Sequence, residues 1–202
     1  MFVIVRHGNT FATGETPRRI GARTDLPLTT QGEAQAQALG RHFAALGWHF
    51  DRVLVSPLQR TQQTARAILA GQKDAARPEP ADFLREIDHG PDENQPEDMV
   101  LARIGQAALS AWDAHGTPPP GWQVDAENRK TAWAALFTAS GQNTATLLVT
   151  SNGAARIALQ ADAALKAAIR ELPGLKLPTG GYGVIRRSAD GALEVPVWGK
   201  RP

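Results

Sequence analysis

The sequence predicts an α/β fold in which strands and helices alternate along the chain. Three short apolar runs, at residues 2–5, 51–55 and 146–150, have the length and composition of strands that are buried on both faces of a sheet. Segments with helical periodicity or helix-capping residues separate these runs and follow the last one. Because parallel strands need such crossover connections, the sheet is predicted to be mostly parallel.

The first half of the chain predicts one long loop and two helices. Residues 8–27 are rich in Gly, Pro, Thr and Arg, and loops of that length in a compact domain usually have a function. Residues 30–33 have the capping-box pattern Thr-x-x-Glu and are expected to begin a helix that ends at Leu46. After the second strand, Ser56 is expected to cap a helix whose first residue is Pro57.

The second half predicts further helices and a closing pair of strands. The helices are expected at residues 96–115, 125–140, 152–160 and 163–171. Residues 71–82 are predicted to be a polar connector, and residues 88–98 an acidic loop whose carboxylates are solvated. Residues 183–187 and 193–197 are predicted to be two edge strands around an Asp-Gly turn.

Composition narrows the class of protein. The chain has 202 residues, of which 42% are hydrophobic and 21% charged, as expected of one globular domain spanning residues 1–202. A net charge of +2 gives no reason to expect nucleic-acid binding. Because there is no cysteine, disulfides and thiolate chemistry are excluded. No apolar run is long enough to span a membrane and no signal peptide is visible, so the expected location is the cytoplasm.

Polar residues that follow the strands predict an anion site. Ligands of parallel sheets bind beyond the carboxyl ends of the strands, where Arg6 and His7 follow the first strand and Arg60 lies shortly after the second. Guanidinium groups bind phosphate in a bidentate manner, and an imidazole can attack phosphorus. An Arg-His pair at a strand end is nevertheless more often structural than functional, so these residues alone leave both interpretations open.

Four segments together resemble a known family. Residues 6–8, Arg-His-Gly after an N-terminal strand, resemble the signature of the histidine phosphatase superfamily, also called phosphoglycerate mutase-like. Residues 21–36 (GARTDLPLTTQGEAQA), 56–65 (SPLQRTQQTA) and 84–93 (LREIDHGPDE) resemble further motifs of that family, in the same order. The resemblance covers nearly the whole chain. It implies a three-layer sandwich, with a mostly parallel central sheet and helices on both faces.

The resemblance also implies roles for individual residues. His7 corresponds to the nucleophile that accepts the phosphoryl group, and Arg6 and Arg60 to the cations that hold its oxygens. Glu86 corresponds to the group that protonates the leaving alcohol and then activates water, which is the proton transfer that this chemistry needs. A backbone carbonyl is expected to orient the His7 ring.

Further residues are expected to complete the phosphate site. Asn9 follows the first strand, and Ser151 and Asn152 follow the third, so we expect all three to bind the phosphate. No metal and no cofactor are expected, since the chain shows no ligand spacing typical of a metal site.

One position departs from the family pattern. The family normally has a second histidine after the third strand, and Ser151 stands in its place. Losing that charge-assisted donor would remove about 2–4 kcal/mol of transition-state stabilisation, so activity is expected to be weak, restricted to an unusual substrate, or absent. His89 is either a substitute for the missing histidine or an exposed loop residue. Three loop arginines either bind a second acidic group of the substrate or are simply solvated: Arg18, Arg19 and Arg23.

The leading hypothesis is a phosphomonoester hydrolase that acts on a small phosphorylated metabolite through a phosphohistidine. The alternatives are a phosphoglycerate mutase-type phosphotransferase, and a catalytically weak member that binds a phosphorylated ligand or a protein partner. True mutases carry Trp-Asn soon after the first motif and Arg after the acidic Glu. This chain has Ala12, Thr13 and Ile87 at those places, which favours the phosphatase. The sequence leaves the oligomeric state open, with a homodimer as one option.

Overall fold

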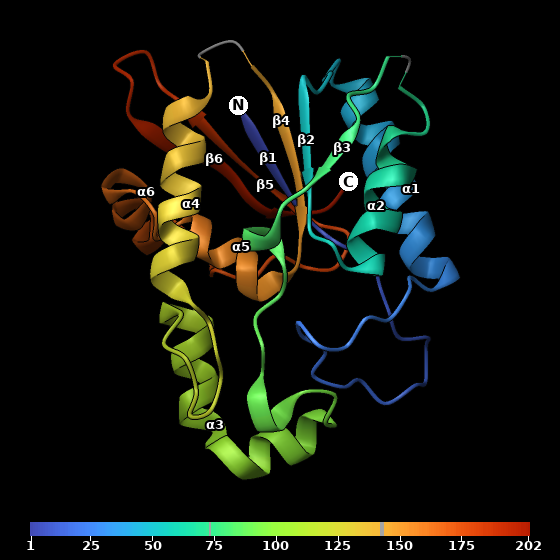
Figure 1. The fold of residues 1–202 in the computed structure, drawn as a ribbon, viewed down its shortest axis with the longest axis vertical. Coiled ribbons are helices and arrows are strands. Elements are labelled where there is room, and N and C mark those ends of the chain that lie inside the picture. Colours follow the sequence, from blue (N-terminus) through green and yellow to red (C-terminus); the bar gives the residue numbers. More distant parts are fainter. Residues whose placement is uncertain (73, 142–143) are drawn as a thin grey trace.

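One mixed sheet organises the computed structural model, which describes residues 1–72, 74–141 and 144–202 (Figure 1). Its strands lie in the order β3-β2-β4-β1-β5-β6. Their bounds are β1 (Phe2–Arg6), β2 (Arg52–Val55), β3 (Pro78–Pro80), β4 (Thr146–Thr150), β5 (Tyr182–Arg187) and β6 (Leu193–Lys200). Strands from the beginning and the end of the chain therefore lie side by side.

The three predicted apolar strands form the centre of the sheet. β4 lies between β1 and β2 and is parallel to both, and β3 adds a further parallel pair with β2. β5 and β6 are antiparallel additions next to β1. The prediction of a mostly parallel sheet is confirmed, because three of these five pairings are parallel.

Two strand predictions were wrong. The strand predicted at residues 183–187 is β5, which is not an edge strand because it pairs with both β1 and β6. β3 lies within the predicted connector, of which residue 73 falls outside the described residues. The two prolines in β3 concealed it, since proline cannot donate to a ladder and is tolerated at an edge, where β3 lies.

Helices cover both faces of the sheet (Figure 1). α1 (Thr30–Ala45) and α2 (Gln59–Leu69) lie on one face, and α4 (Ala126–Ala139), α5 (Asn152–Ala158) and α6 (Ala163–Ala168) on the other. α3 (Glu97–His115) extends beyond the carboxyl ends of the parallel strands. Three short 3₁₀ turns complete the secondary structure of the described chain: η1 (Asp82–Leu84), η2 (Gly90–Asp92) and η3 (Ile169–Glu171).

Alternate residues of β1 supply the two halves of the core. Phe2 and Ile4 belong to the cluster that includes Trp133 of α4, whereas Val3 and Val5 belong to the cluster that includes Phe43 of α1. Because successive side chains of a strand point to opposite faces, a fully apolar strand is required where both faces are covered. The apolar run at the start of the sequence therefore reports a central, doubly covered strand.

Three helices differ from the predictions, two of them at their first residues and one by an interruption inside it. The cap of α1 is Thr29, whose Oγ1 accepts from the Gly32 N–H at 3.1 Å, rather than the expected Thr30. α2 begins at Gln59 without a side-chain cap, so Ser56 does not cap it as predicted. α3 is interrupted at Gly105, where a φ of 79° breaks the helix. A residue with a side chain rarely adopts that conformation, which explains the glycine.

The long loop at residues 8–27 and α3 both lie beyond the carboxyl ends of the parallel strands (Figure 1). Within the ranges that the structure describes, no helix is long and apolar enough to cross a membrane. The predicted site residues therefore lie at the end of the sheet that these two segments enclose.

Candidate active site

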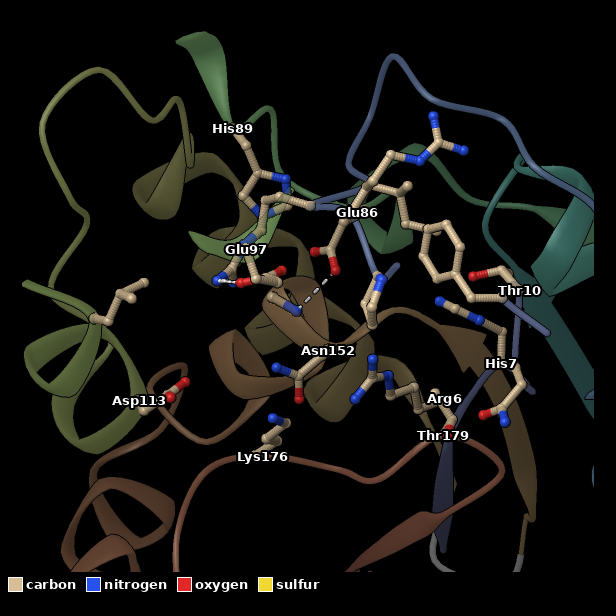
Figure 2. Close-up of a pocket in the computed structure, with 18 of the residues that line it drawn as sticks. Arg6, His7, Thr10, Glu86, His89, Glu97, Asp113, Asn152, Lys176 and Thr179 are labelled. Atoms are coloured by element: carbon tan, nitrogen blue, oxygen red, sulfur yellow. Dashed lines mark hydrogen bonds and ion pairs between the residues drawn. The ribbon is translucent and has the colours of Figure 1, made fainter. Parts of the chain in front are cut away.

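A cavity of about 630 Å³ lies at the carboxyl ends of the central strands. Five of the predicted site residues line it: Arg6, His7, Asn9, Glu86 and Asn152. Figure 2 shows Arg6, Glu86, Asn152 and Lys176 around the same cavity. The structure thus gathers residues from the ends of β1 and β4 and from the segment before α3, as expected from the topology.

His7 is buried and held in one orientation. Its Nδ1 lies 2.7 Å from the carbonyl oxygen of Gly8, so Nδ1 carries the proton and donates it. Burial, followed by the positive charges of Arg60 and Arg6, lowers the pKa of His7 well below its usual value. His7 is therefore neutral, with Nε2 unprotonated, as a nucleophile must be.

Arg60 contacts His7, is fully buried and lies outside the cavity lining. Its Nε donates to His7 Nε2 at 3.2 Å. Its two terminal nitrogens donate to loop carbonyls, Nη1 to Thr24 at 2.7 Å and Nη2 to Gly21 at 3.1 Å. These bonds fix the guanidinium in a plane beside the nucleophilic nitrogen, where it can hold an oxygen of a phosphoryl group bound to His7.

Arg6 is the last residue of β1 and lines the cavity. Its Nη1 donates to the Leu177 carbonyl at 2.8 Å, while its buried Nε has no partner among the described residues. Burial lowers the pKa of Arg6 to about 10, and the nearby Glu86 carboxylate opposes that effect. The side chain therefore stays positively charged at neutral pH, with donors available to an anion.

Glu86 is a buried carboxylate that backbone amides hold. Oε1 accepts from the N–H groups of Ile87 at 2.9 Å and Ala154 at 3.1 Å, and Oε2 accepts from Gly153 at 3.1 Å. Burial alone would raise the pKa of Glu86, but the charge of His89 and these hydrogen bonds outweigh it and lower the pKa. Without substrate, Glu86 is therefore ionised.

Of the three predicted phosphate ligands that carry no charge, two line the cavity. Asn9 is held by Gln35 and Gln31 of α1, and Asn152 Oδ1 accepts from the Leu177 N–H at 3.0 Å. Ser151 lies outside the cavity lining and is fully buried, and its Oγ has no partner among the described residues. The structure thus places Ser151 beneath the cavity surface.

The prediction that the carboxylates of residues 88–98 are solvated was right for Glu97 and Asp98, which are exposed. It was wrong for Asp92, which is buried, and for Glu93, whose side chain is only 6% exposed. Arg103 and Trp122 donate to Asp92, and residues of the first loop and His89 donate to Glu93. His89 lines the cavity and is only 4% exposed. The alternative that His89 is an exposed loop residue was therefore wrong.

The loop arginines divide into two groups. Arg18 and Arg19 line the cavity and stack on Phe11 and Trp122, at 5.6 and 5.2 Å from the ring centroids. Arg23 lies outside the lining and binds Asp88 and the Gly90 carbonyl at the surface. Only Arg18 and Arg19 are therefore placed to meet a ligand.

Lys176 is a cavity residue that the sequence did not reveal. It precedes Leu177, whose N–H and carbonyl bond Asn152 and Arg6. In the part of the chain that the structure describes, Lys176 forms no ion pair within 4.0 Å. No sequence pattern marks it, because only the path of the segment before β5 brings it to the site.

Among the described residues, no group of three or more His, Asp or Glu side chains is arranged to hold a metal ion. The cavity offers its ligand guanidinium, ammonium, imidazole, carboxylate, amide and hydroxyl groups. A neutral buried imidazole beside two guanidinium groups and an ionised carboxylate suits transfer of an anionic group to nitrogen.

One known family matches nearly the whole chain, and several known proteins match part of it. The family described as histidine phosphatase superfamily (branch 1) matches residues 2–198. A 2,3-bisphosphoglycerate-dependent phosphoglycerate mutase of Rhizobium etli is 35% identical over 121 residues, which are 59% of this chain and 57% of the mutase. The fructose-2,6-bisphosphatase TIGAR B of Danio rerio is 37% identical over 58% of this chain and 45% of its own. The matches thus span about half the length of these relatives.

Solved structures resemble the fold over almost the whole chain. A putative alpha-ribazole-5'-P phosphatase from Escherichia coli K-12 has a TM-score of 0.75 at 23% identity, covering 99% of this chain and 96% of its own. A mycobacterial glucosyl-3-phosphoglycerate phosphatase has a TM-score of 0.76 at 19% identity, covering 98% and 97%. At these identities the likeness shows the fold alone, and it agrees with the predicted α/β architecture.

Proposed function

Because the chain belongs to the histidine phosphatase superfamily (branch 1), we propose that it is a phosphomonoester hydrolase acting on a small phosphorylated metabolite through a phosphohistidine. One observation carries the proposal. His7 is buried and neutral, with Nδ1 fixed on a carbonyl and Nε2 facing the Arg60 guanidinium at 3.2 Å beside a 630 Å³ cavity.

In the first step, His7 Nε2 attacks the phosphorus atom and the bond from phosphorus to the ester oxygen breaks. Arg6 and Arg60 balance the charge on the phosphoryl oxygens, with Asn9 and Asn152 of the cavity lining as additional donors. The leaving alkoxide takes a proton from Glu86. A bound phosphate raises the pKa of a neighbouring carboxyl by like-charge repulsion, so substrate binding is what prepares Glu86 as an acid.

In the second step, water attacks the phosphorus atom and the bond from phosphorus to Nε2 breaks. Glu86, now ionised again, takes the proton of that water, and inorganic phosphate is released. The depressed pKa of Glu86 in the free enzyme supports this second role, because an ionised carboxylate is the form that can act as a base.

The mutase alternative differs in the fate of the phosphohistidine. A mutase must return the phosphoryl group to the bound alcohol, whereas a hydrolase must admit water. The curated relatives include a mutase and a bisphosphatase, and two of the similar solved structures are phosphatases. The residues after the first motif and after Glu86 differ from those of true mutases, which supports the hydrolase.

The test is a panel of phosphate esters with vanadate as an inhibition control. We expect phosphate release that vanadate inhibits and a protein-bound phosphate that is labile in acid. His7→Ala should abolish both. Interconversion of phosphoglycerates without phosphate release would support the mutase instead. If neither reaction occurs but vanadate still binds, the chain is a binding member of the family.

A further inference from the structure

We propose that Glu93 is a positioning residue that sets the Arg60 guanidinium beside His7 by holding the loop segment at residues 21–24. The inference rests on the proposed function, in which Arg60 holds the phosphoryl group. It concerns a carboxylate that takes no part in the two chemical steps.

Glu93 is one of the groups that attach the first loop to the turn before α3, beside the backbone hydrogen bonds of Arg19 with Asn94 and Gln95. Its side chain is only 6% exposed. Oε1 accepts from the Gly21 N–H at 2.8 Å, the Arg23 N–H at 3.1 Å and the Thr24 hydroxyl at 2.8 Å. Oε2 accepts from the His89 N–H at 3.1 Å. A single carboxylate thus satisfies three donors of a loop segment that belongs to no helix or strand.

The same segment binds Arg60 through its carbonyl groups. Gly21 and Thr24 each accept a hydrogen bond from a terminal nitrogen of Arg60, at 3.1 and 2.7 Å. Arg60 in turn donates to His7 Nε2. Glu93 accepts hydrogen bonds from the Gly21 N–H and the Thr24 hydroxyl, and the carbonyl groups of the same two residues accept hydrogen bonds from Arg60. A continuous chain of hydrogen bonds therefore links Glu93 to the nucleophile.

Close packing supports this arrangement. A Cβ atom added at Gly21 would lie 2.3 Å from Glu93 Oε2 and 2.5 Å from both His89 Nδ1 and the Ile87 carbonyl oxygen. At Gly21 the loop backbone therefore lies too close to Glu93 for any residue that has a side chain. The Ala22 N–H also donates to the Ile87 carbonyl at 3.0 Å, so a backbone hydrogen bond joins the loop to this segment in addition to the bonds of Glu93.

Removing the charge of Glu93 should change the position of Arg60 more than the fold. In Glu93→Gln, the amide oxygen can keep the three loop donors of Oε1, but only as a neutral acceptor, and the amide nitrogen meets the His89 N–H, which loses its partner. The loop segment keeps its covalent path, its contact with Ile87 and the bonds of the Arg23 side chain, but weaker hydrogen bonds hold Gly21 and Thr24. Arg60 should then sample other positions, which weakens the binding of a phosphate analogue.

The experiment is a double-mutant cycle on vanadate affinity, measured by calorimetry with Glu93→Gln, Arg60→Ala and the double variant. We expect Glu93→Gln to weaken vanadate binding about 10-fold in the wild-type background and less than about 2-fold in the Arg60→Ala background. If Arg60→Ala does not fold, Arg60→Met preserves the buried volume and serves in its place. Fully additive effects would overturn the proposal, since Glu93 would then act independently of Arg60.

Asp92→Asn is the matched control. Asp92 is also a buried carboxylate of the same turn, but its partners are Arg103 and Trp122, and no hydrogen bond links it to the loop that holds Arg60. The Asp92→Asn variant should have a lower melting temperature than the wild-type protein, and its vanadate affinity should stay within 2-fold of the wild-type value. An equal loss of affinity in this control would mean that any disturbance of the turn suffices, which also contradicts the proposal.

Failure of the proposed function is recognised separately. If the wild-type protein binds vanadate but releases no phosphate from any ester, the hydrolase proposal falls. The coupling between Glu93 and Arg60 is still measured on vanadate and decides the positioning role alone.

Discussion

Glu86→Gln separates proton transfer from the rest of catalysis. In this variant the amide oxygen can keep the two N–H groups that Oε1 accepts, and the amide nitrogen then faces the Gly153 N–H, 3.1 Å from the atom it replaces. One buried donor loses its acceptor, which costs about 1–3 kcal/mol of stability. For a chain of about 200 residues, each kcal/mol corresponds to about 2–4 °C in melting temperature, so the variant should still fold.

The catalytic effect should depend on the leaving group. Loss of a general acid slows proton transfer by about 10²- to 10⁴-fold, but a nitrophenolate departs without a proton. We therefore expect kcat/KM to fall at least 100-fold for an alkyl phosphate and less than 10-fold for p-nitrophenyl phosphate. The comparison uses kcat/KM because that ratio reports the steps up to phosphorylation of His7.

An equal fall in kcat/KM for both esters would refute the assignment. Glu86 would then contribute charge or structure rather than a proton. Wild-type protein and the variant should also be compared by circular dichroism at the assay temperature, so that partial unfolding, which lowers both rates alike, is recognised from its own signal.

Three further outcomes are expected. Burial opposes ionisation of Glu93, but its hydrogen bonds outweigh burial and lower its pKa to about 2, so the stability that the ionised carboxylate contributes should be present above pH 4.5 and lost as the pH falls toward 2; chemical unfolding across that range should show a flatter curve for Glu93→Gln. Lys176→Gln should raise KM about 3- to 10-fold with kcat unchanged, whereas Lys166→Gln on α6, remote from the cavity lining, should leave both constants as they are. Ser151→Ala removes a buried hydroxyl that has no partner among the described residues and lies outside the cavity lining, so it should change stability by less than about 0.5 kcal/mol and leave vanadate affinity within about 2-fold; a 10-fold loss of affinity would instead place Ser151 in the phosphate site.

The sequence predicted the parts of this site that strand ends determine. Arg6 and His7 leave β1 and Asn152 follows β4, and adjacent parallel strands necessarily bring those positions together. Thr29 was missed as the cap of α1 by a single residue, because two threonines stand side by side and either could accept the bond. Errors of this kind move an element end without moving the site.

Contacts that depend on loop paths could not be predicted in this way. An acidic, proline-containing segment has the composition of a solvated loop, and only the fold shows that Glu93 faces backbone donors from a segment about 70 residues earlier. The hydrogen bonds explain why that charge is buried at all, since a carboxylate that accepts four of them retains its ionised form inside the protein.

Burial and hydrogen bonding also account for the two opposite protonation states at the centre of the site. His7 is buried next to two guanidinium groups, and both burial and those charges favour its neutral form. Glu86 is buried as well, but three amide N–H groups and nearby positive charges favour its charged form. A neutral imidazole and an ionised carboxylate therefore share one cavity at the same pH, and the difference comes from the surrounding positive charges and hydrogen bonds rather than from exposure. A substitution that removes one of those groups should therefore change the pKa of His7 or Glu86 even where the backbone keeps its position.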